Sequence, residues 1–423
     1  MLLASPWKPR LADGLGSASE RLVEALARDI VDGSLPAGAR LPAHRPLAWQ
    51  LAIGIGTVTK AYAQLERRGL VRSVRGRGMF VAGLSQATSR MVDLSINVPP
   101  QQLSDRLLAA SLSELARRLD ADSFGAYAAP AGRAEHRAQL ARWLAPSGIA
   151  AAPERLLICN GAQHALAIAF AITCGPDTEL LTEALSYPGA IALARRRGLR
   201  LGGLAIDEEG LVPQALDKAL HEAKTAGRRA VLYVTPTLHN PTTATMSEAR
   251  RQDIARLCRA YDAVIVEDDI HAALAEPGTI AIASLAPERT LHVSGLSKVL
   301  SPGLRIGSLV VPEPWLEPAL AELAATCTMA SLLSCLIMER WLSEDTAASV
   351  ARSIREEASR RVTLARALLP PGTAMSSGHG FHIWLPMAAE RAKALPARAA
   401  ASGILDRKST RLNSSHGTVT RMP

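Results

Sequence analysis

Short apolar runs alternate with helical stretches from Met91 to Leu405, and this alternation limits the possible folds more than any other feature. Five runs have the length of buried strands: RLLIC (155–159), AVLYVTP (230–236), AVIVEDD (263–269), TLHVSG (290–295) and IGSLVV (306–311). Short apolar runs separated by helices are typical of a mostly parallel sheet flanked by helices. We therefore predict an α/β domain over residues 91–405.

Positive charge is concentrated at the two ends of the 423-residue chain. The formal net charge is +9, and residues 1–82 hold twelve Lys and Arg against six Asp and Glu. Residues 406–423 hold four against one, so the long middle is balanced. A basic excess confined to one N-terminal domain favours a surface that contacts phosphates.

The turn residues in 1–82 predict three helices followed by a two-stranded wing. Turn residues separate helices expected over 22–31, 45–51 and 57–68, followed by strands at 70–72 and 79–81. The third helix should bury one face, made of Val58, Ala61, Tyr62 and Leu65. The opposite side and the wing supply the candidate DNA contacts: Arg40, Arg45, Thr57, Thr59, Lys60, Arg75 and Arg77.

The segment RLPAHRPLAWQLAIGIGTVTKAYAQLERRGLVRSVRGRGMFV (40–81) resembles the GntR-type winged helix along nearly its whole length. The resemblance implies an α+β winged helix-turn-helix that binds double-stranded promoter DNA. In one place the sequence departs from the family, which usually has a Ser-Arg pair where this chain has Gly54-Ile55. The missing arginine removes a phosphate or guanine contact, so we expect unusual specificity.

A second group of motifs lies far downstream. Lys298 stands in SGLSKVLSPGLR (294–305), preceded by VEDDIH (266–271) and HNPT (239–242). Pyridoxal phosphate needs a lysine amine, a carboxylate for its pyridine nitrogen, donors to its ring oxygen and a phosphate cup. Each motif alone is a weak signal, because a lone lysine is usually a surface residue. Together they supply one candidate for each requirement.

The order of these motifs resembles fold type I aminotransferases, and in particular the MocR-type regulators, which fuse such a domain to a GntR winged helix. The resemblance covers residues 20–405. It implies that Lys298 is the Schiff-base lysine, that Asp268 is the partner of the pyridine nitrogen, and that both serve catalysis where catalysis occurs. It also implies that Asn240 donates to the ring oxygen.

The same resemblance implies the remaining cofactor contacts. Gly161, Ala162 and Gln163 match the phosphate cup at a helix start, where backbone amides favour an anion. Ser297 and Arg305 match side chains that complete this cup. Two tyrosines complete the set: Tyr187 for stacking on the pyridine ring, and Tyr127 for reaching the phosphate of a neighbouring subunit. We predict no metal site.

Three departures from the aminotransferase pattern bear on chemistry. His271 stands where the fold usually has a tyrosine donating to the ring oxygen, and histidine protonation varies near neutral pH. Gly295 replaces a serine that touches the phosphate in many members. After GHGFHIWLP (378–386) no residue matches the arginine that usually binds the substrate carboxylate.

Two segments lie outside these domains. Residues 83–90 are short and polar and indicate a linker. Residues 406–423 lack apolar periodicity and resemble the translation of a sequencing-library adapter, so we interpret them as an artefact tail that truncates the large domain near Leu405. A genuine basic tail is the alternative.

The combined prediction is a cytoplasmic, homodimeric transcription regulator that senses an amine, an amino acid or a vitamin B6 compound. Scattered cysteines, five in number, and the absence of a signal or membrane-spanning run favour a reducing cytoplasm. A working aminotransferase with a vestigial DNA domain is the alternative, and a non-functional fragment is a third hypothesis. The sequence identifies neither the effector nor the operator.

Overall fold

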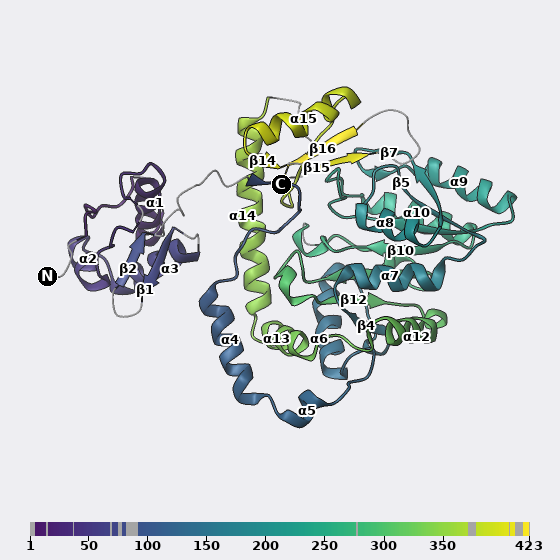
Figure 1. Cartoon of the computed structure of the whole chain (residues 1–423), viewed down its shortest axis with the longest axis horizontal. Coiled ribbons are helices and arrows are strands. Elements are labelled where there is room, and N and C mark those ends of the chain that lie inside the picture. The colour runs from purple at the N-terminus through teal and green to yellow at the C-terminus, as the bar shows by residue number, and fades with distance from the viewer. Residues whose placement is uncertain are drawn as a thin grey trace. The chain divides into compact units, whose positions relative to one another are not determined.

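The computed structural model divides the chain into two units, residues 1–90 and 91–423. It describes residues 5–13, 16–36, 38–67, 70–74, 78–81, 92–275, 278–370, 378–405, 407–410 and 418–422. The predicted wing residues Arg75 and Arg77 and the linker 83–90 lie outside the described residues. Figure 1 labels the helices and strands.

The N-terminal unit contains three helices and a two-stranded antiparallel sheet: α1 (Ala18–Val31), α2 (His44–Gln50), α3 (Ile55–Arg67), β1 (Val71–Val74) and β2 (Gly78–Val81). Ser17 begins α1 with a capping box in which Glu20 bonds back to its backbone. The order and pairing of these elements are those of a winged helix-turn-helix, as predicted.

The predicted buried face of the third helix is confirmed. Val58, Ala61, Tyr62 and Leu65 are fully buried in the core of this unit. The helix begins at Ile55, two residues earlier than predicted, because the carbonyl of Gly54 already accepts the first helical amide bonds.

A seven-stranded sheet forms the centre of the second unit. Its spatial order is β4 (Leu156–Cys159), β12 (Gly307–Val310), β11 (Thr290–Gly295), β10 (Val264–Asp268), β9 (Arg229–Val234), β5 (Thr178–Glu183) and β6 (Arg200–Leu204). Only β12 runs antiparallel to its neighbours, so the sheet is mostly parallel as predicted. All five predicted strands are present, whereas β5 and β6 were missed because polar residues and glycines interrupt their apolar runs.

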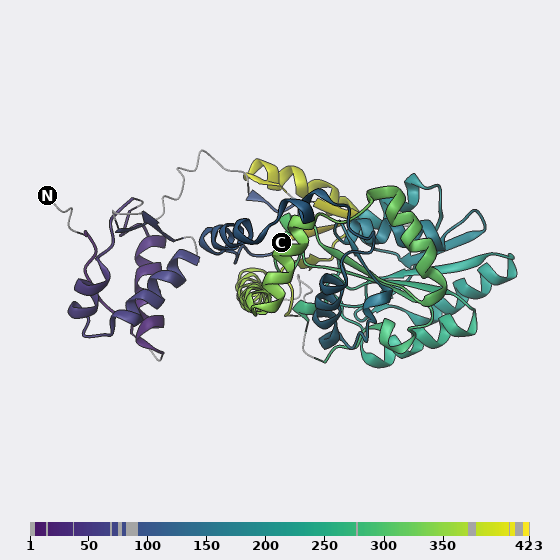
Figure 2. The ribbon, with the colours of Figure 1, turned by 90° about the horizontal axis from the view of Figure 1, so that it is seen from below.

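Helices cover both faces of this sheet, because successive strand residues point to opposite sides. Tyr233 and Val266 pack under α7 (Ala162–Thr173), α8 (Pro188–Arg196) and α12 (Leu316–Cys327). Leu232 and Ile265 face α9 (Pro213–Thr225), α10 (Glu248–Ala260) and α11 (Ile282–Leu285). Figure 2 shows these helices from a second direction.

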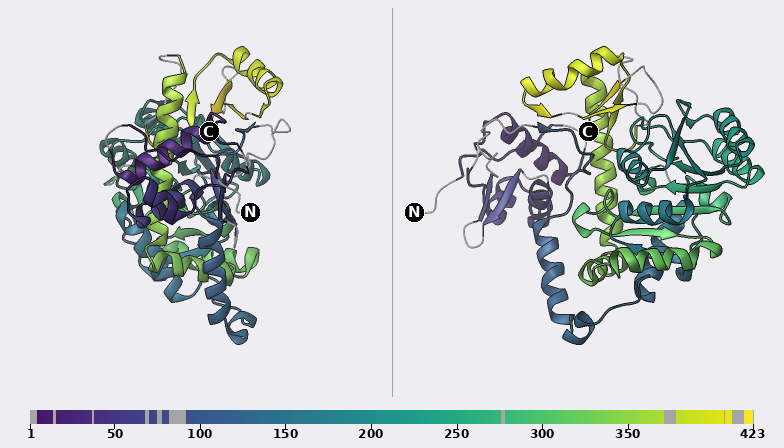
Figure 3. Two further views of the ribbon diagram at one scale, coloured as in Figure 1. Left: turned by 90° about the vertical axis from the view of Figure 1, so that its left-hand side faces the viewer. Right: turned by 45° about the vertical axis from the view of Figure 1, so that its right-hand side comes forward.

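The remaining helices pack beside the sheet: α4 (Asp105–Arg118), α5 (Ala121–Gly125), α6 (Ala134–Leu144), α13 (Leu332–Ser343) and α14 (Thr346–Leu368). Figure 3 shows α14 running from α13 towards α15 (Ala389–Ala401) and its small sheets. These sheets contain β3 (Val92–Asp93) paired with β14 (Ile404–Leu405), and β13 (Ile383–Leu385) paired with β16 (Thr418–Met422), which pairs with β15 (Arg407–Thr410). A separate hairpin joins β7 (Ile206–Asp207) to β8 (Gly210–Leu211).

The C-terminal segment therefore contains strands that the sequence did not predict. β16 pairs with β13 from Ile383 to Leu385. Backbone hydrogen bonds require no particular side-chain pattern, so strands can form in a segment that lacks apolar periodicity. This strand pairing does not test whether residues 406–423 are an artefact tail, so that interpretation stays a hypothesis.

All five cysteines are free thiols. The sequence pattern predicts buried thiols, which is confirmed for Cys159, Cys258 and Cys335 and wrong for the half-buried Cys174 and Cys327. Within the part of the chain that the structure describes, every helix is too short or too polar to cross a bilayer.

Candidate functional site

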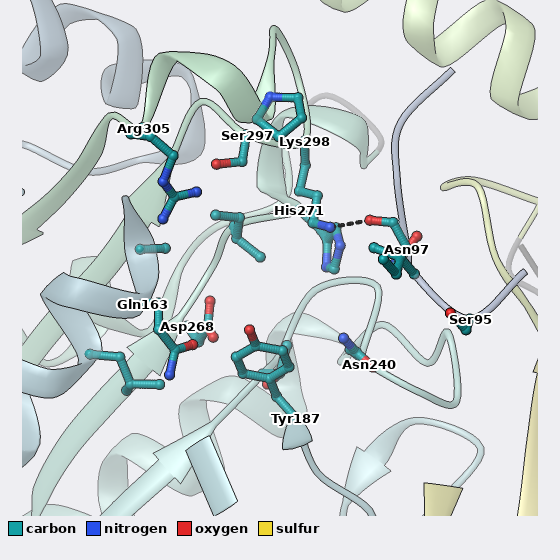
Figure 4. A pocket seen from close by; sticks show the side chains of 16 residues that line it. Ser95, Asn97, Gln163, Tyr187, Asn240, Asp268, His271, Ser297, Lys298 and Arg305 are labelled. Atoms are coloured by element: carbon teal, nitrogen blue, oxygen red, sulfur yellow. Dashed lines mark hydrogen bonds between the residues drawn. The ribbon is translucent and has the colours of Figure 1, made fainter. Parts of the chain in front are cut away.

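A cavity of about 290 Å³ lies at the carboxyl ends of the central strands, where open α/β sheets commonly bind ligands (Figure 4). Nine of the eleven predicted cofactor residues line it: Lys298, Asp268, Asn240, His271, Tyr187, Ala162, Gln163, Ser297 and Arg305. Gly161 lies directly behind Arg305. Tyr127 is 84% exposed and is not part of this lining, so its predicted reach to another subunit stays a prediction.

The start of α7 forms a cup suited to an anion. Gly161 precedes the helix with a φ of 86°, and a Cβ built there would lie 2.4 Å from the guanidinium of Arg305. A Cβ on Gly307 would lie 2.4 Å from the Gly161 carbonyl carbon, so both glycines are required for this close packing. The first amides of a helix have no intrahelical partner, and with Arg305 they favour a phosphate.

Asp268 is the buried carboxylate of the cavity. It is the last residue of β10, and its Oδ2 accepts a 2.8 Å hydrogen bond from the Tyr233 hydroxyl on the adjacent strand β9. Burial raises the pKa of Asp268 to about 6, although the Tyr233 bond opposes this change. A cationic ring nitrogen beside it would favour the ionised form.

More buried acids stand behind Asp268. Burial raises the pKa of Glu183, at the end of β5, to about 7, although the Thr235 amide donates to its Oε1 at 3.0 Å. His239 Nε2 lies 4.0 Å from the same oxygen. Burial likewise raises the pKa of Glu267 to about 7, and its two oxygens accept the first amides of α11. Several buried carboxyl groups therefore lie at the carboxyl ends of the central strands, where ionising them costs free energy.

Lys298 is held by two contacts. Its ammonium donates a hydrogen bond to the carbonyl of Asn97, drawn as a dashed line in Figure 4. The same nitrogen lies 5.9 Å from the centre of the Phe381 ring, within the range of a cation–π contact. The His271 ring lies 6.2 Å from the Phe381 ring and 5.8 Å from the His382 ring, and it lines the same cavity as Lys298. Its predicted bond to the ring oxygen of the cofactor stays a prediction.

The sequence did not predict several residues of this site. Ser95, Ile96 and Asn97 line the cavity in a bent segment after β3, about 200 residues from Lys298 along the chain. We name residues 94–98 the strap. Thr235 also lines the cavity, and Tyr233 acts through Asp268. No short motif marks such residues, because their roles arise from long-range packing.

Polar atoms in the cavity fit the predicted cofactor. Oδ1 of Asp268, Oδ1 of Asn240 and Oε1 of Gln163 are buried and have no hydrogen-bond partner among the described residues. Buried polar atoms are almost always paired in proteins, so three such atoms around one cavity indicate a polar ligand. The lysine, the carboxylate and the anion cup match the three ends of pyridoxal phosphate, which supplies an electron sink for amine chemistry.

Five of the candidate DNA contacts lie within the described residues: Arg40, Arg45, Thr57, Thr59 and Lys60. Arg45, Thr59 and Lys60 are exposed, and Thr57 is half-buried. The Thr59 hydroxyl donates to the carbonyl of Ile55 at 3.0 Å and keeps its acceptor lone pairs, so its contact with DNA stays a prediction. Arg40 forms a β-bridge with Phe80 and lies against Gly78, at the base of the wing.

Fold and site together define an aminotransferase-like domain that follows a winged helix-turn-helix. The chain belongs to the aminotransferase class I and II family, which matches residues 89–415, and the bacterial regulatory proteins of the gntR family match residues 18–81. This arrangement is that of the MocR-type GntR regulators.

Known proteins agree with this assignment. The chain is 26% identical to the uncharacterized HTH-type transcriptional regulator YdeF of Bacillus subtilis, over 90% of this chain and 83% of that protein. It is 28% identical to the vitamin B6 salvage pathway transcriptional repressor PtsJ of Salmonella typhimurium, over 88% and 86%. LysN, an alpha-aminoadipate aminotransferase from Thermus thermophilus, shares the fold with a TM-score of 0.70 at 24% identity, over 80% of this chain and 89% of LysN.

Glu183 predicts a pH dependence of stability. Its pKa is raised from 4.5 to about 7, so the folded protein binds this proton more tightly than the unfolded chain does. The resulting stability is complete below pH 4.5 and is lost as the pH rises through 7, by at most about 3 kcal/mol. Denaturant unfolding at pH 5 and pH 8 should therefore show a smaller decline in Glu183→Gln. The exposed Glu154→Gln variant is the control, and an unaltered decline in Glu183→Gln would contradict the prediction.

Proposed function

We propose that this protein is a transcription regulator that binds promoter DNA through its winged helix and senses an amine, an amino acid or a vitamin B6 compound through pyridoxal phosphate held at Lys298. The observation that carries the proposal is the single cavity lined by Lys298, Asp268 and the α7 cup, in a chain that also has a winged helix-turn-helix. The similarity to PtsJ, a vitamin B6 salvage pathway transcriptional repressor, supports a B6 compound as effector.

Each residue has a proposed part in holding the cofactor. Lys298 provides the amine, Asp268 pairs with the ring nitrogen, and Asn240 and His271 face the ring oxygen. Tyr187 stacks on the ring. The phosphate is bound by the backbone and side chains at the cup: Gly161, Ala162, Gln163, Ser297 and Arg305.

Lys298 is the test of cofactor binding. Adding pyridoxal phosphate to the full chain should give the visible absorption band of a cofactor joined to a lysine, and Lys298→Ala should abolish this band because it removes the amine. Absorption spectra of both proteins provide the measurement. Lys218→Ala, which removes an exposed lysine on α9, should keep the band. A band that survives in Lys298→Ala would refute the assignment.

The same cavity would also serve a working aminotransferase, which is the alternative function. The aminotransferase alternative is supported by the set of candidate cofactor residues that line one cavity. Amino-group transfer from amino acids to a keto acid, measured on the full chain, distinguishes an enzyme from a regulator that only senses.

DNA binding should depend on salt in proportion to the number of phosphate contacts. Replacing Arg75 and Arg77 together by alanine should weaken binding to all sequences and lower the log–log salt slope by about 1.8, the value for two lost contacts. Lys60→Ala on the exposed side of α3 should change sequence preference more. Fluorescence anisotropy at several salt concentrations measures both effects, and a slope unaffected by the double replacement would exclude the wing as a phosphate-binding element.

The strap offers a route from the cavity to the DNA-binding unit. It is anchored by β3, which pairs with β14 and stands between the linker and the strap in the chain. Its backbone carbonyl at Asn97 accepts a hydrogen bond from the Lys298 ammonium. Both polar side-chain atoms of Asn97 are buried without a partner among the described residues. We propose that ligand chemistry at Lys298 changes this contact and thereby the strap.

Hydrogen exchange tests this coupling. When Lys298 is joined to pyridoxal phosphate it can no longer offer a free ammonium to Asn97, so amide exchange in the strap should accelerate. Lys298→Met should exchange rapidly with or without cofactor, and Lys298→Arg, which keeps a cation, should exchange slowly in both conditions. Mass-spectrometric exchange reports each case. Equal strap exchange in the cofactor-free wild type and in Lys298→Met would disprove the coupling.

A homodimer is also proposed. The segment from α4 to the residues after α5 exposes four large apolar or aromatic side chains: Leu108, Leu112, Phe124 and Tyr127. Contiguous exposed apolar surface marks interaction sites, and a second copy would bring its Tyr127 towards a partner. Two winged helices would then meet two operator half-sites.

A further inference from the structure

The first residue of α3 is an isoleucine that the core does not use. The side chain of Ile55 is 50% exposed, whereas Ile53, two residues earlier, packs against the core of the N-terminal unit. Leu51 also packs against that core. A β-branched residue at an exposed helix start gains nothing in helix propensity. Folding therefore gives no reason for an isoleucine at position 55.

Glycines on either side of Ile55 are equally unexplained by folding. A Cβ on Gly56 would meet nothing within 4 Å, and a Cβ on Gly54 would meet only Thr57 Oγ1 at 3.6 Å. Neither glycine has a positive φ. Together they leave Ile55 as the side chain that protrudes from the start of the helix.

The first turn of α3 offers few side-chain groups that can hydrogen-bond to bases. It contains no acidic residue, its one hydroxyl is that of the half-buried Thr57, and the Thr59 hydroxyl that follows donates to the Ile55 carbonyl. The N-terminal end of a helix carries partial positive charge, which suits approach to DNA. This turn can approach a base edge, but what it presents there is mainly apolar.

We infer that Ile55 recognises a thymine in each operator half-site by packing against its C5 methyl group. The inference depends on the proposed DNA binding through α3. In a helix-turn-helix, the first residues of the recognition helix meet base edges in the major groove. Thymine is the base that presents an apolar group there. An isoleucine placed against guanine, cytosine or adenine would leave their donors or acceptors without partners.

The experiment first selects operators for the full chain from a random DNA library. Each thymine of the selected operator is then replaced singly by uracil, which lacks only the methyl group. One replacement per half-site should weaken binding roughly fourfold, the effect of exposing one buried methyl. Replacing the same base pair so that 5-methylcytosine carries the methyl should restore part of the affinity.

Variants assign the methyl effect to Ile55. Ile55→Ala should bind the thymine and uracil operators equally, while Gln64→Ala, later on the same helix, should keep the fourfold difference. Gly56→Ala should leave the thermal unfolding midpoint unchanged or raised, because its Cβ meets nothing, and yet weaken operator binding. Salt-dependent binding with no uracil-sensitive position would overturn the inference and leave the proposed function standing. Absence of salt-dependent binding would refute the proposed function itself.

Discussion

The burial of several carboxyl groups at one edge of the central sheet is the constraint around which the large domain is arranged. A buried carboxylate is costly unless hydrogen bonds or cations compensate it. Tyr233 stabilises Asp268 and the amides of α11 stabilise Glu267, while the pair of His292 and Asp269, 3.5 Å apart, compensates a third carboxyl. Burial alone would raise the pKa of Asp269, but His292 lowers it.

This arrangement explains why the cavity suits a cation-bearing ring. Oδ1 of Asp268, which lines the cavity, is one of the buried oxygens without a hydrogen-bond partner among the described residues. A protonated ring nitrogen would satisfy this oxygen and restore the charge that burial opposes. Ionising the buried Asp268 thus costs free energy, and a cationic ligand beside it lowers this cost.

The sequence predicted those features whose signals are local. Lys298, Asp268 and Asn240 stand in short motifs with fixed neighbours, and the five strands at 155–311 are continuous apolar runs. The buried face of α3 followed from helical spacing.

The rest could not be predicted because it depends on contacts between distant segments. The strap reaches Lys298 from residues 94–98, and Tyr233 reaches Asp268 across two neighbouring strands. Nothing in the local sequence of Ser95 or Ile96 distinguishes them from other loop residues. The strands β15 and β16 were missed for a different reason, since the backbone pairing of β16 with β13 and with β15 requires no side-chain pattern.

One ammonium group serves two partners, and this sets the size of the proposed signal. A ligand shifts an equilibrium only by its difference in affinity for two states. If cofactor attachment at Lys298 removes the hydrogen bond to Asn97, the difference is that of one charge-assisted bond, about 1.5–3 kcal/mol. This range matches the coupling energies of typical allosteric proteins and corresponds to roughly a tenfold to hundredfold change in affinity. A single contact at the strap is therefore large enough to connect chemistry in the cavity with binding of DNA.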